Sequence, residues 1–361
     1  MSGNIAYYIT AHGYGHGVRS CDIIRALNRE YPDIGLVIVS DLPLAFFENR
    51  LGSGPYSVRA GSFDVGMVQL DSIRVNVADS LCQVLRLYEH RAALVAQECE
   101  FLRSRRIQLV VADIPGMPFE SAQMLGIPCI AVGNFSWDWI YAAYQPEDPR
   151  WASVVGIYLE EYAKADLLLR LPFSPEMGAF RRIEDIPLVA SPGRSRREEI
   201  ARLTGADAGR KWILISFTSL EWGDEALDNV ERLETYEFFT VLPLEWRRAN
   251  IHSVSRDSVR FPDIVASMDA VITKPGFGIL SDCLVNGKPI IYANRSDFAE
   301  YAVLEHAIKR YLKHLHIPAQ KLYRGDLGAA ISKLWDEPAP TDTLVRGGAE
   351  IAARRMRQYL R

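Results

Sequence analysis

The feature that most constrains the fold is a local pattern that occurs once in each half of the chain. Residues 109–132 give an apolar strand, a loop with proline and glycine, a helix, the stop Gly-Ile-Pro and a second apolar strand. Residues 269–293 repeat this order around the loop KPGFG and the stop Asn-Gly-Lys-Pro. Glycine ends each helix because it tolerates the left-handed conformation, and the proline prevents further helix. The repetition predicts two similar α/β domains rather than one long sheet.

The N-terminal residues show a related order. Residues 5–10 are predicted to form a buried strand, residues 11–17 (AHGYGHG) a glycine-rich turn, and residues 36–40 the next strand. Between the turn and the second strand, apolar residues recur every three or four positions from Val18 to Tyr31, which predicts a helix. A strand, a helix and a strand at this spacing predict a parallel sheet that begins near residue 5.

The length agrees with two domains, since 361 residues compare with roughly 100–200 residues per domain. A polar, glycine-containing stretch at 191–211 is predicted to connect them, with a short helix at 196–203. We therefore expect Rossmann-like domains at 1–190 and 212–340, and a C-terminal helix within 341–361. Ala352, Met356 and Leu360 share one face of that helix, which indicates that it docks on the rest of the protein.

Composition excludes several classes of protein. Lys and Arg number 41 against 45 Asp and Glu, so a general basic face for nucleic acid is not expected. The five cysteines are widely spaced without a C-x-x-C pair, which favours reduced intracellular thiols over disulfides or a structural zinc site. We find no apolar run long enough to span a membrane and no signal peptide, so a cytoplasmic protein is expected.

The first glycine-rich loop, HGYGHG at residues 12–17, follows a strand and opens a helix. It is not a full G-x-G-x-x-G, because Val18 occupies the third glycine position, but Asp41 after the next strand keeps a dinucleotide site open as a weak alternative. His12 and His16 lie four residues apart without a third ligand, so zinc is not favoured. His16 is either a general base at the sheet edge or a histidine that hydrogen-bonds the turn.

The second loop, KPGFG at residues 274–278, also joins a strand to a helix. Gly276 and Gly278 leave room for a ligand, and the following helix N-terminus can hold a diphosphate without a metal. Asp282 lies about one turn further on, within reach of a ribose. The alternative is a tight turn followed by a solvated Asp282.

An aromatic cluster, NFSWDWIY at residues 134–141, follows the strand CIAV. Trp137 and Trp139 flank Asp138, and rings beside a carboxylate suit a sugar. The residues alone favour core packing slightly over a sugar site.

Several stretches together resemble GT-B glycosyltransferases of the lipid II N-acetylglucosaminyltransferase and UDP-glycosyltransferase type. More closely, they are similar to the glycosyltransferase-like N-terminal region of plant L-arabinokinases and its free-standing bacterial relatives. The matching stretches are YYITAHGYGHGVRS, LVVADIP, GNFSWDWIY, LLLRLPFSPEMGAFRRIEDIPLV and KPGFGILSDCLVNGKPIIYANRSDFAEY. They lie between residues 7 and 301, and it is their combination that is specific.

The resemblance implies the GT-B fold, in which two facing Rossmann-like domains enclose a cleft. The N-terminal domain would bind the acceptor and the C-terminal domain the nucleotide-sugar donor. The implied reaction is a metal-independent, inverting transfer from a UDP-sugar, or another nucleotide-diphosphate sugar, to an acceptor hydroxyl, without a further cofactor. His16 is placed as the general base and Asp113 as the carboxylate that orients it. An epimerase or hydrolase of nucleotide sugars and a non-catalytic binding module are alternatives on the same fold.

The other site residues follow from their positions in the family motifs. Asp282 stands where the family has a ribose-binding glutamate, and Thr218 replaces a glycine of the phosphate-contacting turn. The resemblance places the acceptor against His12, Tyr14, Trp137, Asp138 and Trp139. It places the donor against Gly15, Ser216, Thr218, Ser219, Phe261, Lys274, Gly276, Phe277, Gly278, Asp282, Asp297 and Glu300.

Sugar kinase activity is not implied. In plant arabinokinases that activity belongs to a separate C-terminal domain with a glycine- and serine-rich ATP loop, and no such loop occurs in this sequence. The acceptor is not identified, and self-association into a homo-oligomer is left open.

Overall fold

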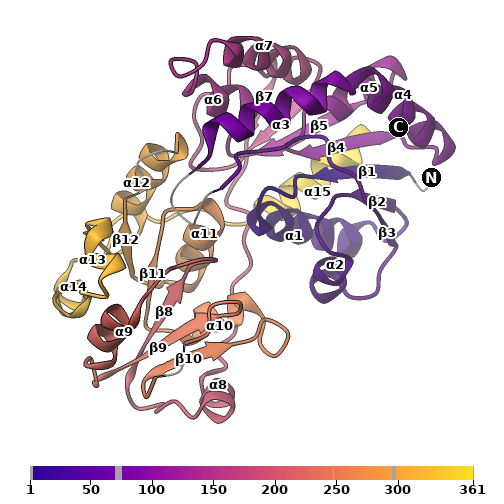
Figure 1. Cartoon of the computed structure of the whole chain (residues 1–361). Helices are drawn as coiled ribbons and strands as arrows, with labels where there is room; N and C mark the ends of the chain where they lie inside the picture. The colour runs from indigo at the N-terminus through magenta and orange to yellow at the C-terminus, as the bar shows by residue number, and fades with distance from the viewer. Residues whose placement is uncertain (1–2, 70–74, 247, 295–297, 361) are drawn as a thin grey trace. The chain divides into compact units, whose positions relative to one another are not determined.

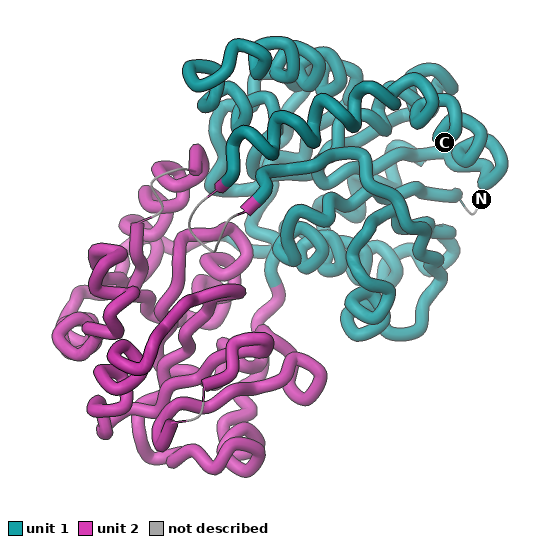
Figure 2. The backbone as a smooth tube through the Cα atoms, in the orientation of Figure 1, with its two compact units in different colours: residues 1–68, 76–190, 345–361 teal, residues 69–75, 191–344 magenta. Residues whose placement is uncertain are grey.

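The computed structural model describes residues 3–69, 75–246, 248–294 and 298–360. The chain folds into two compact units, which Figure 2 shows in different colours. Unit 1 comprises Met1–Val68, Asn76–Ala190 and Val345–Arg361, and unit 2 comprises Gln69–Val75 and Ser191–Leu344. The C-terminal segment therefore belongs to unit 1, although it follows unit 2 in the sequence.

Unit 1 is built on a parallel seven-stranded sheet with the order β3-β2-β1-β4-β5-β6-β7 (Figure 1). Ile9 pairs with Asp113, so the carboxyl ends of β1 and β4 lie side by side. β4 and β5 are buried along their whole length, as expected where helices cover both faces of a parallel sheet. The strands are β1 (Asn4–Ile9), β2 (Gly35–Val39), β3 (Tyr56–Arg59), β4 (Leu109–Asp113), β5 (Cys129–Gly133), β6 (Leu167–Arg170) and β7 (Ile183–Asp185).

The helices of unit 1 connect these strands. They are α1 (Tyr14–Glu30), α2 (Leu44–Leu51), α3 (Val77–Glu89), α4 (Arg91–Ser104), α5 (Met117–Met124), α6 (Trp137–Ala142), α7 (Arg150–Tyr162) and α15 (Gly348–Tyr359). α1 starts earlier than predicted, because residues 14–17 form its first turn and Gly13 is its N-cap. A larger residue would not fit at Gly17 of this helix: a Cβ there would lie 2.6 Å from side-chain atoms of Leu42, just before α2, and of Phe46 on α2.

The C-terminal helix α15 docks on α1, as the apolar face of its sequence predicted. Ala352 and Met356 are fully buried and Leu360 is nearly so. The first residue of α15, Gly348, packs directly against the backbone of Pro187, since a Cβ at Gly348 would lie 2.0 Å from the Pro187 carbonyl oxygen. The two ends of the chain therefore meet in unit 1 (Figure 1), where a Cβ at Gly3 would lie 2.9 Å from the side chain of Leu360.

Unit 2 repeats the topology with a parallel six-stranded sheet of order β10-β9-β8-β11-β12-β13. As in unit 1, the sheet starts in its middle and is extended first to one side and then to the other. The strands are β8 (Lys211–Ser216), β9 (Tyr236–Val241), β10 (Ile251–Val254), β11 (Ala270–Thr273), β12 (Ile290–Ala293) and β13 (His314–Ile317). The helices are α8 (Arg197–Thr204), α9 (Asp224–Glu231), α10 (Phe261–Ser267), α11 (Phe277–Asn286), α12 (Glu300–Tyr311), α13 (Ala319–Tyr323) and α14 (Gly328–Asp336).

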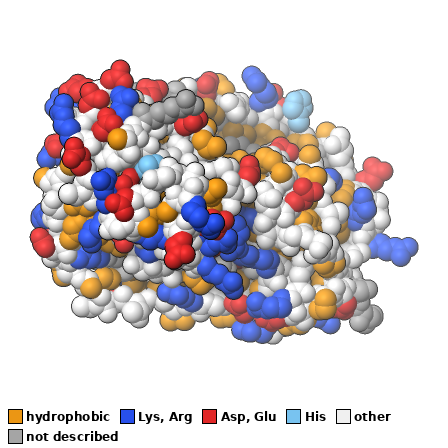
Figure 3. All heavy atoms as spheres, turned by 90° about the horizontal axis from the view of Figure 1, so that it is seen from below, with side chains coloured by type: hydrophobic (Ala, Val, Ile, Leu, Met, Phe, Trp, Pro, Cys, Tyr) orange, Lys and Arg blue, Asp and Glu red, His pale blue; other side chains and the backbone are white. Residues whose placement is uncertain are grey.

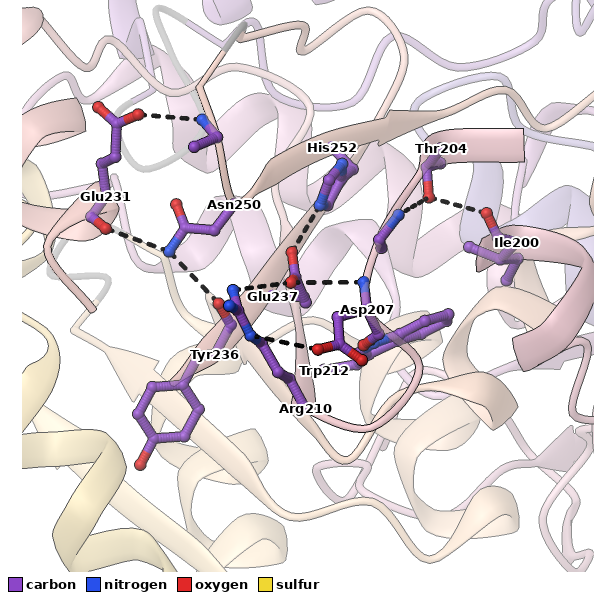
Figure 4. A network of polar contacts seen from close by, with 12 residues as sticks. Ile200, Thr204, Asp207, Arg210, Trp212, Glu231, Tyr236, Glu237, Asn250 and His252 are labelled. Carbon is purple, nitrogen blue, oxygen red and sulfur yellow. Dashed lines mark hydrogen bonds and ion pairs between the residues drawn. The ribbon is translucent and has the colours of Figure 1, made fainter. Parts of the chain in front are cut away.

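Residues 191–211, predicted as a connection, are part of unit 2 in the structure. The short helix expected there is α8. A polar network ties the following turn to the sheet (Figure 4): the Arg210 guanidinium donates to Glu237 Oε1 at 3.1 Å, and Glu237 Oε2 lies 2.6 Å from His252 Nε2. The indole of Trp212 donates to the carbonyl of Asp207 at 2.8 Å.

Acidic and basic side chains both occur across the face of the molecule in Figure 3, in keeping with a formal charge of −4. Within the described part of the chain, no helix combines the length and apolarity that a bilayer crossing requires. All five cysteines are free, as their spacing predicted, and only Cys82 is exposed.

Candidate active site

The candidate site of unit 1 lies where the strand order reverses. β1 continues to β2 on one side, and its other neighbour is β4. In open parallel sheets, ligands bind outside the carboxyl ends of the strands at this position. The loop after β1 carries His12 and leads into α1, while β4 ends at Asp113.

The structure brings His16 and Asp113 together across 97 positions of sequence. His16 lies in the first turn of α1 and is 8% exposed, and Asp113 is completely buried. The Nδ1 atom of His16 is 2.8 Å from Asp113 Oδ1. Because a carboxylate accepts, it favours the tautomer with the proton on Nδ1 and leaves the lone pair of Nε2 available.

A third charged group, Arg19, completes this cluster and was not predicted from the sequence. Its side chain is 3% exposed, and it donates from Nε to Asp113 Oδ2 at 2.7 Å and from Nη2 to Asp113 Oδ1 at 2.5 Å. Its Nη1 donates to Asn134 Oδ1 at 2.5 Å, and the hydroxyl of Ser20 donates to Asp113 Oδ2 at 2.9 Å. The one available sequence signal was position: Arg19 follows His16 by one helical turn.

The charges shift the pKa values of the pair in the same direction. Burial favours the neutral form of Asp113, but Arg19 and then His16 outweigh it and hold the pKa of this carboxyl well below its usual range. Burial and the Arg19 charge lower the pKa of His16 against the opposing effect of Asp113. The cluster therefore presents an ionised carboxylate and a neutral imidazole, which is the state a general base requires.

Aromatic residues lie on the His16 side of the pair and around the neighbouring His12. Phe135 meets the His16 ring edge-on at 5.4 Å, and His12 meets Trp137 edge-on at 5.3 Å. Trp137 is completely buried and stacks on Tyr141 at 5.4 Å, so its ring is part of the core rather than an open sugar platform.

Asp64, which was not predicted from the sequence, is a second buried carboxyl near the end of β1. Its Oδ2 accepts from the Trp137 indole at 2.8 Å and its Oδ1 from the Thr10 hydroxyl at 2.8 Å. Burial raises its pKa to about 6. Gly66, two residues on, lies under the His12 ring, since a Cβ there would be 2.2 Å from His12 Nδ1. This segment therefore supports His12 and the aromatic cluster.

The other expected acceptor residues differ in exposure. Tyr14 is 46% exposed at the start of α1, with its ring against Phe46. Trp139 is partly exposed on α6. Asp138 is 8% exposed, and burial raises its pKa.

In unit 2 the corresponding reversal of strand order lies between β8 and β11. Thr273 joins the ends of these strands, because its hydroxyl donates to the carbonyl of Ser216 at 3.1 Å. Lys274 follows Thr273, and Gly276 is the N-cap of α11, with no side-chain cap on that helix. A Cβ at Gly276 would meet only Ile279 within 4 Å, at 3.8 Å, so packing within the chain does not require glycine there.

The remaining donor residues lie on loops and helices of unit 2. Phe277 and Gly278 open α11, Asp282 lies buried further along it, and Glu300 is the buried first residue of α12. Phe261 starts α10 under the guanidinium of Arg256, and Thr218 and Ser219 are exposed after β8. Gly15 lies in α1 of unit 1. Asp297 lies outside the described residues.

Among the described residues, no three His, Cys, Asp or Glu side chains gather in an arrangement that could hold a metal ion.

Comparison with solved structures identifies the architecture. The glycosyltransferase of kitacinnamycin aligns over 99% of this chain and 95% of its own, with a TM-score of 0.62 and 15% identity. UGT2 from Phytolacca americana, solved with UDP-2fluoro-glucose and pterostilbene, aligns over 99% and 93%, with a TM-score of 0.64 and 12% identity. The chain has the GT-B fold. SnogD from Streptomyces nogalater, a glycosyltransferase, aligns over 100% and 95%, with a TM-score of 0.55 and 18% identity.

Comparison of sequences gives one curated relative. The L-arabinokinase of Arabidopsis thaliana is 28% identical over 320 residues, which are 85% of this chain but 30% of that protein. The match confirms the resemblance drawn from the motifs, and it covers less than a third of the relative. No family model matches the chain.

Proposed function

We propose that the protein is a metal-independent, inverting glycosyltransferase that uses a UDP-sugar as donor. The observation that carries the proposal is the buried His16–Asp113 pair, at 2.8 Å, at the switch point of one GT-B sheet. At the equivalent point of the second sheet, Gly276 opens the N-terminus of α11. The first arrangement suits a base and the second an anion.

In the proposed reaction, Nε2 of His16 takes the proton of an acceptor hydroxyl while the oxygen attacks the anomeric carbon of the donor. The bond between that carbon and the diphosphate oxygen breaks, and the nucleoside diphosphate leaves with the electron pair. Asp113 stabilises the imidazolium, and the N-terminus of α11 stabilises the leaving diphosphate. A single displacement inverts the anomeric centre.

The donor assignment draws on the relatives. The Phytolacca americana protein was solved with UDP-2fluoro-glucose and a Siraitia grosvenorii transferase with UDP, and both share this fold. The arabinokinase match does not extend the proposal to sugar kinase activity, because it covers 30% of that protein. The five free thiols fit a reducing compartment, so the proposed location is the cytoplasm.

A donor-by-acceptor screen read by mass spectrometry tests the proposal. The full chain is incubated with UDP-sugars, small metabolites and cell extract in the presence of EDTA. A product heavier by one sugar residue, absent with His16→Ala, is the expected result. Turnover of the UDP-sugar without any acceptor would replace the proposal by an epimerase or hydrolase. Binding of UDP-sugar without turnover would replace it by a binding module.

A further inference from the structure

Arg19 is the member of the cluster that a His–Asp pair does not by itself need. Its guanidinium is 3% exposed, and burying a charge is unfavourable unless it is closely paired. Arg19 meets both oxygens of Asp113, at 2.7 and 2.5 Å, and Asn134 Oδ1 at 2.5 Å. The planar group is thus held on three sides in one orientation.

We propose that Arg19 is a positioning residue: it keeps Asp113 ionised and keeps the His16 ring neutral and Nδ1-protonated, so that the base stays free at mildly acidic pH. The effect on turnover rests on the proposed function, whereas the effect on His16 itself does not.

The geometry at Nδ1 of His16 explains the effect. This atom lies 2.8 Å from Asp113 Oδ1, an acceptor, and 2.9 Å from Arg19 Nη2, which only donates. The Nδ1 proton can therefore be shared only with Asp113. Protonation at Nε2 would place a second positive charge beside the guanidinium, with little water to screen it.

Within the described part of the chain, two charged groups shift the pKa of His16. Arg19 on α1 and Asp113 on β4 are the charged groups that act on its pKa, which burial and Arg19 lower. Phe135, after β5, covers the ring edge. Asp64 and Asp138 bring carboxyls from the segment after β3 and from α6; burial raises the pKa of each, and neither is among the groups that shift the pKa of His16. The balance between Arg19 and Asp113 therefore decides the state of His16.

Unit 2 offers a matched control, in which a histidine, a carboxylate and an arginine also meet. His252 meets Glu237 at 2.6 Å, and Arg210 donates to Glu237 at 3.1 Å (Figure 4). The Arg210 side chain is 41% exposed and donates one hydrogen bond to Glu237, whereas the buried Arg19 donates to both oxygens of Asp113. Arg210→Gln removes a guanidinium from a histidine–carboxylate pair without touching His16.

The test is an NMR titration of the full chain with ¹⁵N-labelled histidine, in which His16→Asn assigns the His16 signals. In the wild type we expect His16 to be neutral at pH 7, protonated on Nδ1, with a pKa below the ordinary value. Arg19→Gln should raise that pKa, Arg19→Lys should keep most of the lowering because the charge remains, and Arg210→Gln should leave it unchanged. The ratio of turnover at pH 6 to that at pH 8 should fall about threefold or more in Arg19→Gln, because removing a nearby charge moves a pKa by roughly one unit or more.

Three results would overturn the role of Arg19: a protonated His16 in the wild type at pH 7, an unchanged titration in folded Arg19→Gln, or an ordinary pKa in Arg19→Lys. The first and third decide the question even where Arg19→Gln, which leaves Asp113 buried without its partner, does not fold. A shifted His16 in a protein that transfers sugar to no acceptor would refute the proposed function alone. Transfer by the wild type with an unshifted His16 would refute the role of Arg19 alone.

Discussion

At the residue scale, the proposed chemistry is tested most directly by substitutions of His16 and Asp113. His16→Ala should fold, bind nucleotide and lose about 10²–10⁴-fold in turnover, the range typical of a lost general base. Asp113→Asn should lose a similar factor, because the amide no longer holds the Nδ1 proton. The two losses should not add in the double variant, since the pair works as one unit. Turnover and nucleotide affinity of the three variants check this, and near-normal turnover of His16→Ala on a neutral hydroxyl would move the base to Asp138.

A second prediction at this scale concerns Gly276 and the binding of the donor. A Cβ there meets only Ile279, at 3.8 Å, and Gly276 has an ordinary extended conformation. Gly276→Ala should therefore change the free energy of unfolding by at most about 1 kcal/mol but weaken UDP binding about tenfold, or about 1.4 kcal/mol, by crowding the diphosphate. Gly156→Ala on α7, where a Cβ meets nothing within 4 Å, is the control. Calorimetric UDP affinities equal to wild type in Gly276→Ala would remove the loop from the donor site.

At the residue scale, the pairing of His16 with Asp113 was predicted from the family motifs and not from the spacing of the residues. The structure places the two side chains 2.8 Å apart, because the carboxyl ends of β1 and β4 lie side by side in the sheet. The contact of Arg19 with Asp113 could not be expected, because the direction of the Arg19 side chain depends on α1 starting at Tyr14 rather than after the turn. Asp64 could not either, because it follows β3 in an irregular segment that no periodicity describes.

At the element scale, α7 carries a buried carboxyl that links stability to pH. Glu161 is completely buried; its Oε2 accepts from Tyr88 at 2.8 Å, while Arg91 lies 3.6 Å from its other oxygen. Burial outweighs these contacts and raises the pKa of Glu161 to about 7 from an ordinary 4.5. The folded state thus binds the proton more tightly than the unfolded chain, so its stability is complete below about pH 4.5 and declines as pH rises to about 7.

Glu161→Gln should flatten that decline. Linkage puts the contribution of this group at about 3 kcal/mol at most, and the variant keeps the smaller decline that Asp64 contributes, because the pKa of Asp64 is raised to about 6. Urea unfolding between pH 4.5 and 8 measures the effect. Glu160→Gln, the exposed neighbour on α7, should keep the wild-type slope. A Glu161→Gln slope equal to that of the wild type would mean that the carboxyl is ionised in the folded protein.

At the scale of the whole molecule, the same strand order occurs twice, and a different chemistry is proposed at each switch point. The repeated strand–loop–helix–strand pattern predicted both sheets, because strand ends, glycine stops and prolines are local signals in the sequence. It did not predict that residues 345–361 return to unit 1. The docking of α15 on α1 is a long-range contact, and its one local signal is the apolar face of the helix.

The proposed division of base and donor site between the two units predicts how nucleotide binding and stability are coupled. UDP should raise the melting temperature of the full chain in EDTA, because the proposed site holds the diphosphate with backbone amides and a helix N-terminus rather than a metal. Binding to the native state alone stabilises by about 2.7 kcal/mol at a ligand concentration of ~100 Kd. Scanning calorimetry checks this, with His16→Ala expected to respond as the wild type does and Gly276→Ala to need about tenfold more UDP for the same shift. A response that requires manganese or magnesium, or an equal response from Gly276→Ala, would show that the nucleotide is held elsewhere or by other means.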